Sequence, residues 1–317
     1  MAAVTKASRR SPVLTSSGLA CLSTLPTINL TTGCLHDCLY CYIRGYRNYP
    51  GDGRVILYEN TLELLRHELL RLDTKRHAVY FSPSSDLFQP APEVLELAHS
   101  VLEFLLSNGV GVAFLTKGVI PDCTLQLLIE HRELVRAQIG LITLDEGISR
   151  IFEPHAASPE RRLRQLQTLI AGGIQAEARL DPILPGLTDS PGLLNELLAS
   201  LAGVGVKRTA AGVLFLRPGI LYWLKSRVSD RRMLALLLHA YQEGQQVVMR
   251  GAQYPILNLS TEARRQIFER LERAAAAHGI EIKICACKNA DLARGSCNIA
   301  GTWPRRAPAV QPLLVTV

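Results

Sequence analysis

Short apolar runs alternate with amphipathic stretches along most of the chain. Leu62, Leu65, Leu69 and Leu72, for example, recur at helical spacing between the apolar runs at 27–31 and 77–81. Buried strands separated by amphipathic helices are typical of a parallel sheet with helices outside it. The strands are predicted at 27–31, 77–81, 111–116, 138–144, 175–180 and 207–216.

Six such units in succession favour a partial (β/α)6 barrel over a doubly wound sheet, although the spacing alone does not decide between them. Ser158-Pro159 and Ser190-Pro191 predict helix starts, because a hydroxyl caps the helix and proline suits its first position. The first of these helices has a predicted apolar face, formed by Leu163, Leu166, Leu169 and Ile170.

The pattern divides the chain into three parts. Residues 1–25 are rich in Ser, Thr, Ala and Arg and short of periodicity, so we expect a flexible lead-in. Residues 26–228 hold the predicted barrel. Residues 229–317 form a C-terminal extension with helices near 233–241 and 261–278, a short strand at 281–284, and cysteines.

Composition indicates a globular protein with a sizeable core. Of 317 residues, 48% are apolar, yet no apolar run approaches the ~20 residues of a membrane span. Residues 1–12 lack the apolar stretch of a signal peptide, so we expect a cytoplasmic protein without membrane contact. The net charge of +7 permits an anionic or nucleic-acid substrate, but the charges are spread along the chain, which equally suits a mildly basic enzyme.

Six of the eight cysteines form two trios, whereas Cys21 and Cys123 are interpreted as small apolar residues. The first trio is Cys34, Cys38 and Cys41. Three thiolates suit an iron–sulfur cluster and leave one iron of a [4Fe–4S] cluster without a protein ligand. The alternative is a structural zinc site, which usually takes four ligands, with His36 as the only nearby addition.

The second trio is Cys285, Cys287 and Cys297. It predicts a second iron–sulfur cluster with an open or non-cysteine ligand position. A zinc site or simply reduced thiols are the alternatives, since this spacing is not diagnostic.

Polar groups follow the end of every predicted barrel strand, where a β/α barrel collects its functional side chains. Together they predict a mouth that could hold a charged cofactor. Arg217, which precedes Tyr222-Trp223, suits a substrate phosphate and a stacked base, or else plugs the open barrel edge. The strand-end groups are the Cys34 loop, Ser84-Ser85-Asp86, Lys117, Asp145-Glu146, Asp181 and Arg217.

A CxxxCxxC motif that opens the first loop of a β/α barrel is the signature of the radical S-adenosylmethionine (radical SAM) enzymes, which this sequence resembles. It is most similar to the spore photoproduct lyase-like branch, also called DNA repair photolyase-like. The resemblance covers about residues 29–223, in the segments 38–42, 84–86, 116–117, 153–155, 159–163 and 182–189.

The resemblance implies that Cys34, Cys38 and Cys41 hold a [4Fe–4S] cluster that reductively cleaves S-adenosylmethionine. The resulting 5′-deoxyadenosyl radical would abstract a substrate hydrogen, with electrons from a donor such as a flavodoxin or ferredoxin. The implied cofactor-binding residues are Tyr40, Ser84, Ser85, Asp86 and Lys117, with Ser85 and Lys117 at the methionine end.

Two further residues, Tyr42 and Arg217, are expected to take part in catalysis. Tyr42 is expected to pack over the adenine or relay a hydrogen, or else only to pack around the cluster, and Arg217 to contact substrate. The lyase has a hydrogen-donating cysteine where this chain has Pro83, which removes that route of thymine-dimer repair.

We therefore expect a radical SAM enzyme with an unidentified substrate, a nucleic acid being one candidate, and with a second cluster. Alternatives are a sulfur-inserting enzyme that uses the second cluster as donor, and a non-catalytic, zinc-stabilised nucleic-acid-binding protein.

Overall fold

The computed structural model describes residues 3–18, 20–69, 78–247 and 256–293. Its main sheet has eight strands in the order β13-β10-β9-β8-β7-β6-β3-β2. Six of them run parallel and are neighbours in chain order, which confirms the partial (β/α)6 barrel; they are β3, β6, β7, β8, β9 and β10. The strands are β2 Thr15–Ser16, β3 Pro26–Ile28, β6 Ala78–Phe81, β7 Gly111–Thr116, β8 Val135–Gly140, β9 Gln175–Ile183, β10 Arg208–Val213 and β13 Glu281–Ile284.

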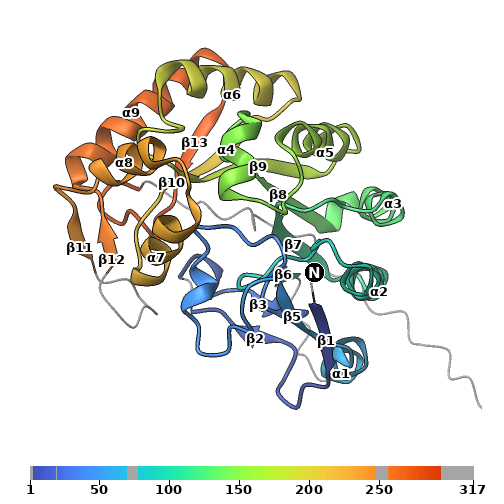
Figure 1. The fold of residues 1–317 in the computed structure, drawn as a ribbon. Helices are drawn as coiled ribbons and strands as arrows, with labels where there is room; N and C mark the ends of the chain where they lie inside the picture. The colour runs from blue at the N-terminus through green and yellow to red at the C-terminus, as the bar shows by residue number, and fades with distance from the viewer. Residues whose placement is uncertain (1–2, 19, 70–77, 248–255, 294–317) are drawn as a thin grey trace, which may run out of the picture.

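Helices cover the outer face of this sheet (Figure 1). Ser158 and Ser190 cap two of them by accepting hydrogen bonds from Arg161 N and Leu193 N, so both predicted starts are confirmed. In the C-terminal extension a long helix packs beside α6 and the added strand β13. The helices are α1 Thr61–Leu69, α2 Pro92–Ser107, α3 Asp122–Glu130, α4 Glu146–Phe152, α5 Pro159–Ala171, α6 Pro191–Gly203, α7 Pro218–Arg227, α8 Arg231–His239 and α9 Thr261–Ala277.

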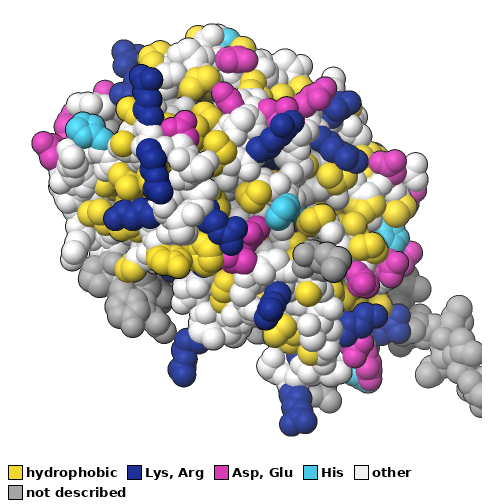
Figure 2. Space-filling model, viewed as in Figure 1, with side chains coloured by type: hydrophobic (Ala, Val, Ile, Leu, Met, Phe, Trp, Pro, Cys, Tyr) yellow, Lys and Arg dark blue, Asp and Glu magenta, His cyan; other side chains and the backbone are white. Residues whose placement is uncertain are grey.

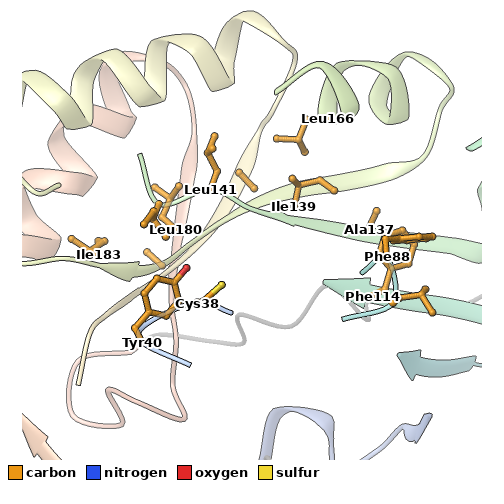
Figure 3. Close-up of a cluster of buried hydrophobic side chains, with 14 of the residues drawn as sticks. Cys38, Tyr40, Phe88, Phe114, Ala137, Ile139, Leu141, Leu166, Leu180 and Ile183 are labelled. Carbon is orange, nitrogen blue, oxygen red and sulfur yellow. The ribbon is translucent and has the colours of Figure 1, made fainter. Parts of the chain in front are cut away.

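One large buried cluster of apolar side chains fills the barrel and the space beneath its helices. Cys38 and Tyr40 belong to this cluster and lie beside each other near Leu180 and Ile183 (Figure 3). The first predicted functional loop is therefore part of the core and closes one end of the barrel.

The N-terminal residues differ from the expected flexible lead-in. Ala3–Ala7 forms strand β1, which pairs in parallel with β5, Arg54–Tyr58. Strand β5 also pairs with β4, Thr31–Thr32, to complete a small three-stranded sheet. The reason is tertiary: only Val4 of β1 packs on the apolar cluster of Leu35, Val55 and Leu57, so the strand has too few apolar positions to show a period.

Several elements lie elsewhere than the apolar pattern predicts. Strand β8 was predicted at 138–144, but it begins at Val135 and ends at Gly140. Its first residues were not recognised because Arg136, although buried, is not apolar. Helices α4 and α7 and the hairpin of β11, Gln245–Val247, with β12, Ile256–Asn258, were not expected.

The surface carries mixed charge. Lys and Arg side chains are interspersed with Asp and Glu over the face shown in Figure 2. Across the described ranges, no helix combines the length and apolar character that a membrane crossing requires.

Candidate active site at the barrel mouth

The first cysteine loop is held in place from its first residue. Gly33 has a φ of 89°, and a Cβ there would lie 2.6 Å from Arg54 O and 2.7 Å from Pro50 Cγ. Only glycine fits this close approach to the chain around β5. The small sheet that contains β1 thus supports the entry to the loop.

The three thiols of this loop lie within electrostatic range of one another. Burial raises the pKa of Cys34 well above its usual value, and Asp86, Cys41 and Cys38 raise it further. Burial likewise raises the pKa of Cys38, with Glu153 adding to the effect and Lys117 opposing it. Burial also raises the pKa of Cys41. Thiolates here need compensating positive charge, which a metal centre supplies.

His36 is not available as a fourth ligand for zinc. Its ring is buried, with Nε2 3.2 Å from Asp86 Oδ2 and Nδ1 3.1 Å from His155 O. Among the residues that the structure describes, no three His, Cys, Asp or Glu side chains meet as ligands of one ion. In a [4Fe–4S] cluster each thiolate binds a different iron, so the three thiolates surround the cluster and do not meet at one ion.

A segment after α4 braces the cysteine loop through its backbone. Leu39 N donates to Phe152 O at 2.9 Å, and His155 N donates to His36 O at 3.2 Å. Two residues further on, Ala157 N donates to Lys117 O at 2.8 Å. The brace therefore fixes the loop of β3 and the end of β7 relative to each other.

Asp86 links three strand ends. Its carboxylate accepts hydrogen bonds from Phe88 N at 2.8 Å, Thr116 Oγ1 at 2.7 Å and Lys117 N at 2.9 Å. Burial alone would raise the pKa of Asp86, but His36 and these hydrogen bonds lower it below its ordinary value. Asp86 thus holds His36, Thr116 and Lys117 N in place around the site.

Ser85 is also committed to protein groups. Its hydroxyl donates to Gly33 O at 2.7 Å and accepts from Gln89 Nε2 at 3.0 Å. Ser84, in contrast, lines a pocket of 180 Å³ that lies between the start of the cysteine loop and the 43–49 segment. Of the predicted serines, Ser84 lines this pocket and hydrogen-bonds the Tyr46 side chain, and Ser85 positions Gly33.

Tyr40 and Lys117 lie behind Cys38, together with Glu153 and Arg162, to which the sequence analysis gave no role. The Tyr40 hydroxyl donates to Glu153 Oε1, and Arg162 Nη1 lies 2.6 Å from Glu153 Oε2. Lys117 Nζ stands 5.7 Å from the centroid of the Tyr40 ring. Burial alone would lower the pKa of Lys117, but Glu153 and Cys38 raise it above its ordinary value. Lys117 is therefore a half-buried cation beside a cysteine ligand candidate.

Tyr42 and Arg217 form a second contact at the mouth. The Tyr42 hydroxyl donates to Pro83 O, and the Arg217 guanidinium carbon lies 5.6 Å from the Tyr42 ring centroid. Trp223 lies elsewhere: its ring contacts Arg44, with 4.6 Å between the guanidinium carbon and the ring centroid. The structure thus brings Arg217 to Tyr42, whereas Trp223 contacts Arg44 and Arg227.

The second cysteine group lies at the ends of β9, β10 and β13. Cys285 is buried against Ala210, and Cys287 packs on the same small cluster. Arg179 Nη2 lies 3.6 Å from Cys285 Sγ. The remaining predicted member, Cys297, is outside the described residues.

Charged side chains surround this second group. Asp181 accepts a hydrogen bond from Arg179 Nη2 at 2.9 Å and forms an ion pair with Lys288. Burial alone would raise the pKa of Asp181, but Lys288 and Arg179 hold it far below its usual range. By contrast, Asp145 is an exposed cap of α4, accepting from Ile148 N, so this strand end does not join the mouth.

Glu153 and Arg162 lie in the segments 153–155 and 159–163 that carry the family resemblance, but the sequence analysis gave neither residue a role. A signal was present in α5, where Arg162 lies four residues before the buried Leu166 and therefore on the same face. A charged residue on an apolar helix face predicts a buried partner, because an unpaired buried charge is costly.

An open barrel of parallel strands with three cysteines in its first loop defines enzymes that can hold an iron–sulfur cluster at the barrel mouth. The model of the Radical SAM superfamily matches residues 28–198, more than half of the chain, and the protein belongs to this superfamily.

Uncharacterised relatives occur in bacteria and in a virus. A Mycobacterium tuberculosis protein is 30% identical over 206 residues, or 62% of this chain and 61% of the relative. A protein of Acidianus two-tailed virus is 25% identical over 216 residues, or 64% of this chain and 72% of the relative. The match thus spans about three fifths of the mycobacterial protein.

Solved structures with the same fold include spore photoproduct lyase. A double mutant of the lyase with bound AdoMet and dinucleoside spore photoproduct has a TM-score of 0.67 at 17% identity, covering 88% of this chain and 81% of the lyase. Streptococcus suis SuiB bound to S-adenosylmethionine has a TM-score of 0.50 at 10% identity, covering 84% and 53%. At these identities the likeness concerns the fold.

Proposed function

We propose that Cys34, Cys38 and Cys41 bind a [4Fe–4S] cluster and that S-adenosylmethionine binds beside it in the barrel mouth. When bound, these cofactors supply a 5′-deoxyadenosyl radical that abstracts hydrogen from a substrate. The observation that supports the proposal is the grouping of three thiols, with Cys38 buried and Cys34 and Cys41 half-buried, next to the half-buried cation Lys117.

The chain's own residues would then divide the work of binding. Lys117 offers its ammonium to the carboxylate of the methionine moiety, and Ser84 offers a hydroxyl from the open side of the loop. Tyr40 forms the apolar wall behind Cys38. Ser85 and Asp86 act less directly, by holding Gly33, Lys117 and His36 in place.

The substrate would approach from the side of Tyr42 and Arg217. A nucleic acid is the class that we propose, because Arg217 can pair with a phosphate and the nearby Tyr46, 40% exposed, can stack with a base. The dinucleoside spore photoproduct bound by the lyase is consistent with this class. Pro83 supplies no thiol at the position of the lyase-type cysteine donor, so the proposed reaction does not use that route of thymine-dimer repair.

Cys285 and Cys287, with Cys297, are proposed to hold a second iron–sulfur cluster. Support comes from the packing of the first two thiols on Ala210 and from the cation Arg179 beside Cys285, since a guanidinium favours thiolates. A low-potential donor such as a flavodoxin or ferredoxin would deliver the electrons.

Anaerobic reconstitution tests both parts of this proposal. About eight irons per chain are expected for two clusters, and about four would refute the second. Dithionite-reduced enzyme should release 5′-deoxyadenosine from S-adenosylmethionine, and failure to do so with a full cluster would overturn the proposed reaction. Loss of sulfide during a single turnover would reassign the second cluster as a sulfur donor.

A further inference from the structure

A charged pair lies beneath Cys38, away from the open side of the mouth. The side chains of Glu153 and Arg162 are both 0% exposed, and they meet at 2.6 Å. Arg162 also donates to Gly140 O at 2.8 Å and to Ser149 Oγ at 2.9 Å. The pair is thus fixed by strand β8 and by helices α4 and α5.

The pair contacts the residues that stand next to Cys38. Glu153 accepts from the Tyr40 hydroxyl, and it is the strongest attractive partner of Lys117. Glu153 also belongs to the segment that braces the cysteine loop through Phe152 and His155. Any movement of this carboxylate would therefore be transmitted to both neighbours of Cys38.

The local charge can be counted. Lys117 and Arg162 carry +1 each, and Glu153 and Asp86, the two carboxylates that attract Lys117, carry −1 each, so loss of the Glu153 charge would leave a net +1 beside Cys38. Buried charges interact more strongly than exposed ones because little water screens them. A charge change at Glu153 should therefore change the reduction potential of a cluster bound at Cys38.

Stability alone is a poor explanation for such a pair. Well-packed apolar residues often replace a buried ion pair without loss of stability. A pair that is costly to desolvate, yet lies against the ligand loop and Lys117, suits a role in tuning that site.

We propose that Glu153 and Arg162 are positioning residues that hold Lys117 and Tyr40 against Cys38 and set the electrostatic field at the cluster. This inference rests on the proposed cluster at Cys34, Cys38 and Cys41. It assigns Glu153 the role of limiting the positive charge there, so that the reduced cluster stays strongly reducing.

Gly140 supplies the space for this arrangement. A Cβ at Gly140 would lie 2.9 Å from Lys117 Cγ and 3.1 Å from both Cε and Nζ. The lysine side chain therefore runs directly over the glycine, and an alanine there would displace it. Gly140→Ala changes the position of Lys117 without changing any charge.

The test measures the reduction equilibrium of the reconstituted cluster by redox titration followed by electron paramagnetic resonance. Glu153→Gln keeps the size of the side chain and an oxygen for Tyr40, but removes the negative charge. We expect the reduced cluster to be favoured at least tenfold, a rise of about 59 mV for one electron. Glu153→Asp, which retains the charge, should stay near the wild-type potential.

Glu160→Gln is the matched control, because Glu160 lies on α5 but is paired in solvent with Arg164. If the fully loaded Glu153→Gln cluster titrates like this control, the inference is overturned. Gly140→Ala provides an independent check if Glu153→Gln does not fold. It displaces Lys117 and should shift the reduction potential of the reconstituted cluster relative to Glu160→Gln, and an unchanged potential would also contradict the inference.

The two proposals fail differently. If wild-type protein takes up no cluster at the first cysteine loop, the proposed function itself is wrong. If it takes up a cluster and makes 5′-deoxyadenosine, but Glu153→Gln leaves the potential unchanged, only the role of the buried pair is wrong.

Discussion

The two cysteine groups of this protein are held in different ways. Around Cys38 the charged side chains are enclosed, with Glu153 and Arg162 both 0% exposed and fixed by backbone contacts. Around Cys285 the cations are partly exposed: the side chain of Lys288 is 21% exposed and that of Arg179 is 15% exposed. The charges of the first group are enclosed in the core, whereas those of the second group reach the solvent.

The sharpest test of this difference is to remove one cysteine from each group. Cys38→Ala should abolish the first cluster and reduce 5′-deoxyadenosine formation to background, because a three-thiolate site has no spare ligand. Cys287→Ala should retain that activity while losing iron. Chromatographic detection of 5′-deoxyadenosine, with iron analysis, measures both. Equal loss in the two variants would show that the groups are not separable.

Breaking the ion pair of the first group should have the next largest effect. Arg162→Met leaves Glu153 buried without a partner, and we expect a loss of about 3–5 kcal/mol in the free energy of unfolding. Denaturant unfolding under anaerobic conditions measures it. Arg164→Met, on the same helix but 66% exposed, should cost no more than ~1 kcal/mol. Similar losses in both variants would argue that the buried pair has no special place in the core.

The corresponding change in the second group should cost less. Lys288→Met removes one of two cations on Asp181, but Arg179 still donates to that carboxylate. We expect a loss of about 1 kcal/mol in unfolding free energy, between the values for exposed and buried charge pairs. A loss as large as that of Arg162→Met would contradict the comparison.

The smallest expected effect is a pH-dependent loss of local stability near Asp291, which follows Cys285 and Cys287 in the chain. Hydrogen bonds from Arg264 lower the pKa of Asp291 to about 2. Since the folded pKa is below that of an unfolded aspartate, near ~3.9, the stabilisation is full above about pH 4 and is lost as the pH falls toward about 2. Hydrogen exchange at Ala293 N–H, which donates to Asn289 O, should lose protection over this range.

Asp291→Asn supplies the reference for that measurement, since its Ala293 protection should not vary over the same pH range. In the first group, Lys117 N–H donates to the buried Asp86, so its exchange should follow global unfolding. If both amides lose protection together at each pH, the two groups unfold as one unit.

Much of the barrel could be predicted because its strands are apolar and its helices are amphipathic. The strands at 111–116 and 281–284 and the capped starts of α5 and α6 are as expected. Strand β1 could not be predicted, because its partner β5 lies some 50 residues away and supplies most of the apolar contact.

The candidate site was predicted by residue type but only partly by role. Ser85 and Asp86 were recognised as strand-end polar groups, yet their hydrogen bonds go to Gly33 and to Lys117 N. Such roles depend on which loops meet in space. The expected apolar face of α5 also omitted Arg162 and Gln165, which are buried because they bind the ends of β8 and β7.

The small sheet of β1, β4 and β5 has a consequence for the order in which the site is made. All three strands are complete by residue 58, so the backing of the cysteine loop can form early during synthesis. Glu153 and Arg162 leave the ribosome about a hundred residues later. Until then the three thiols are not enclosed by a finished core and are exposed to oxidants. Production of the protein under low oxygen should therefore protect these thiols during synthesis, before the core around Cys38 closes.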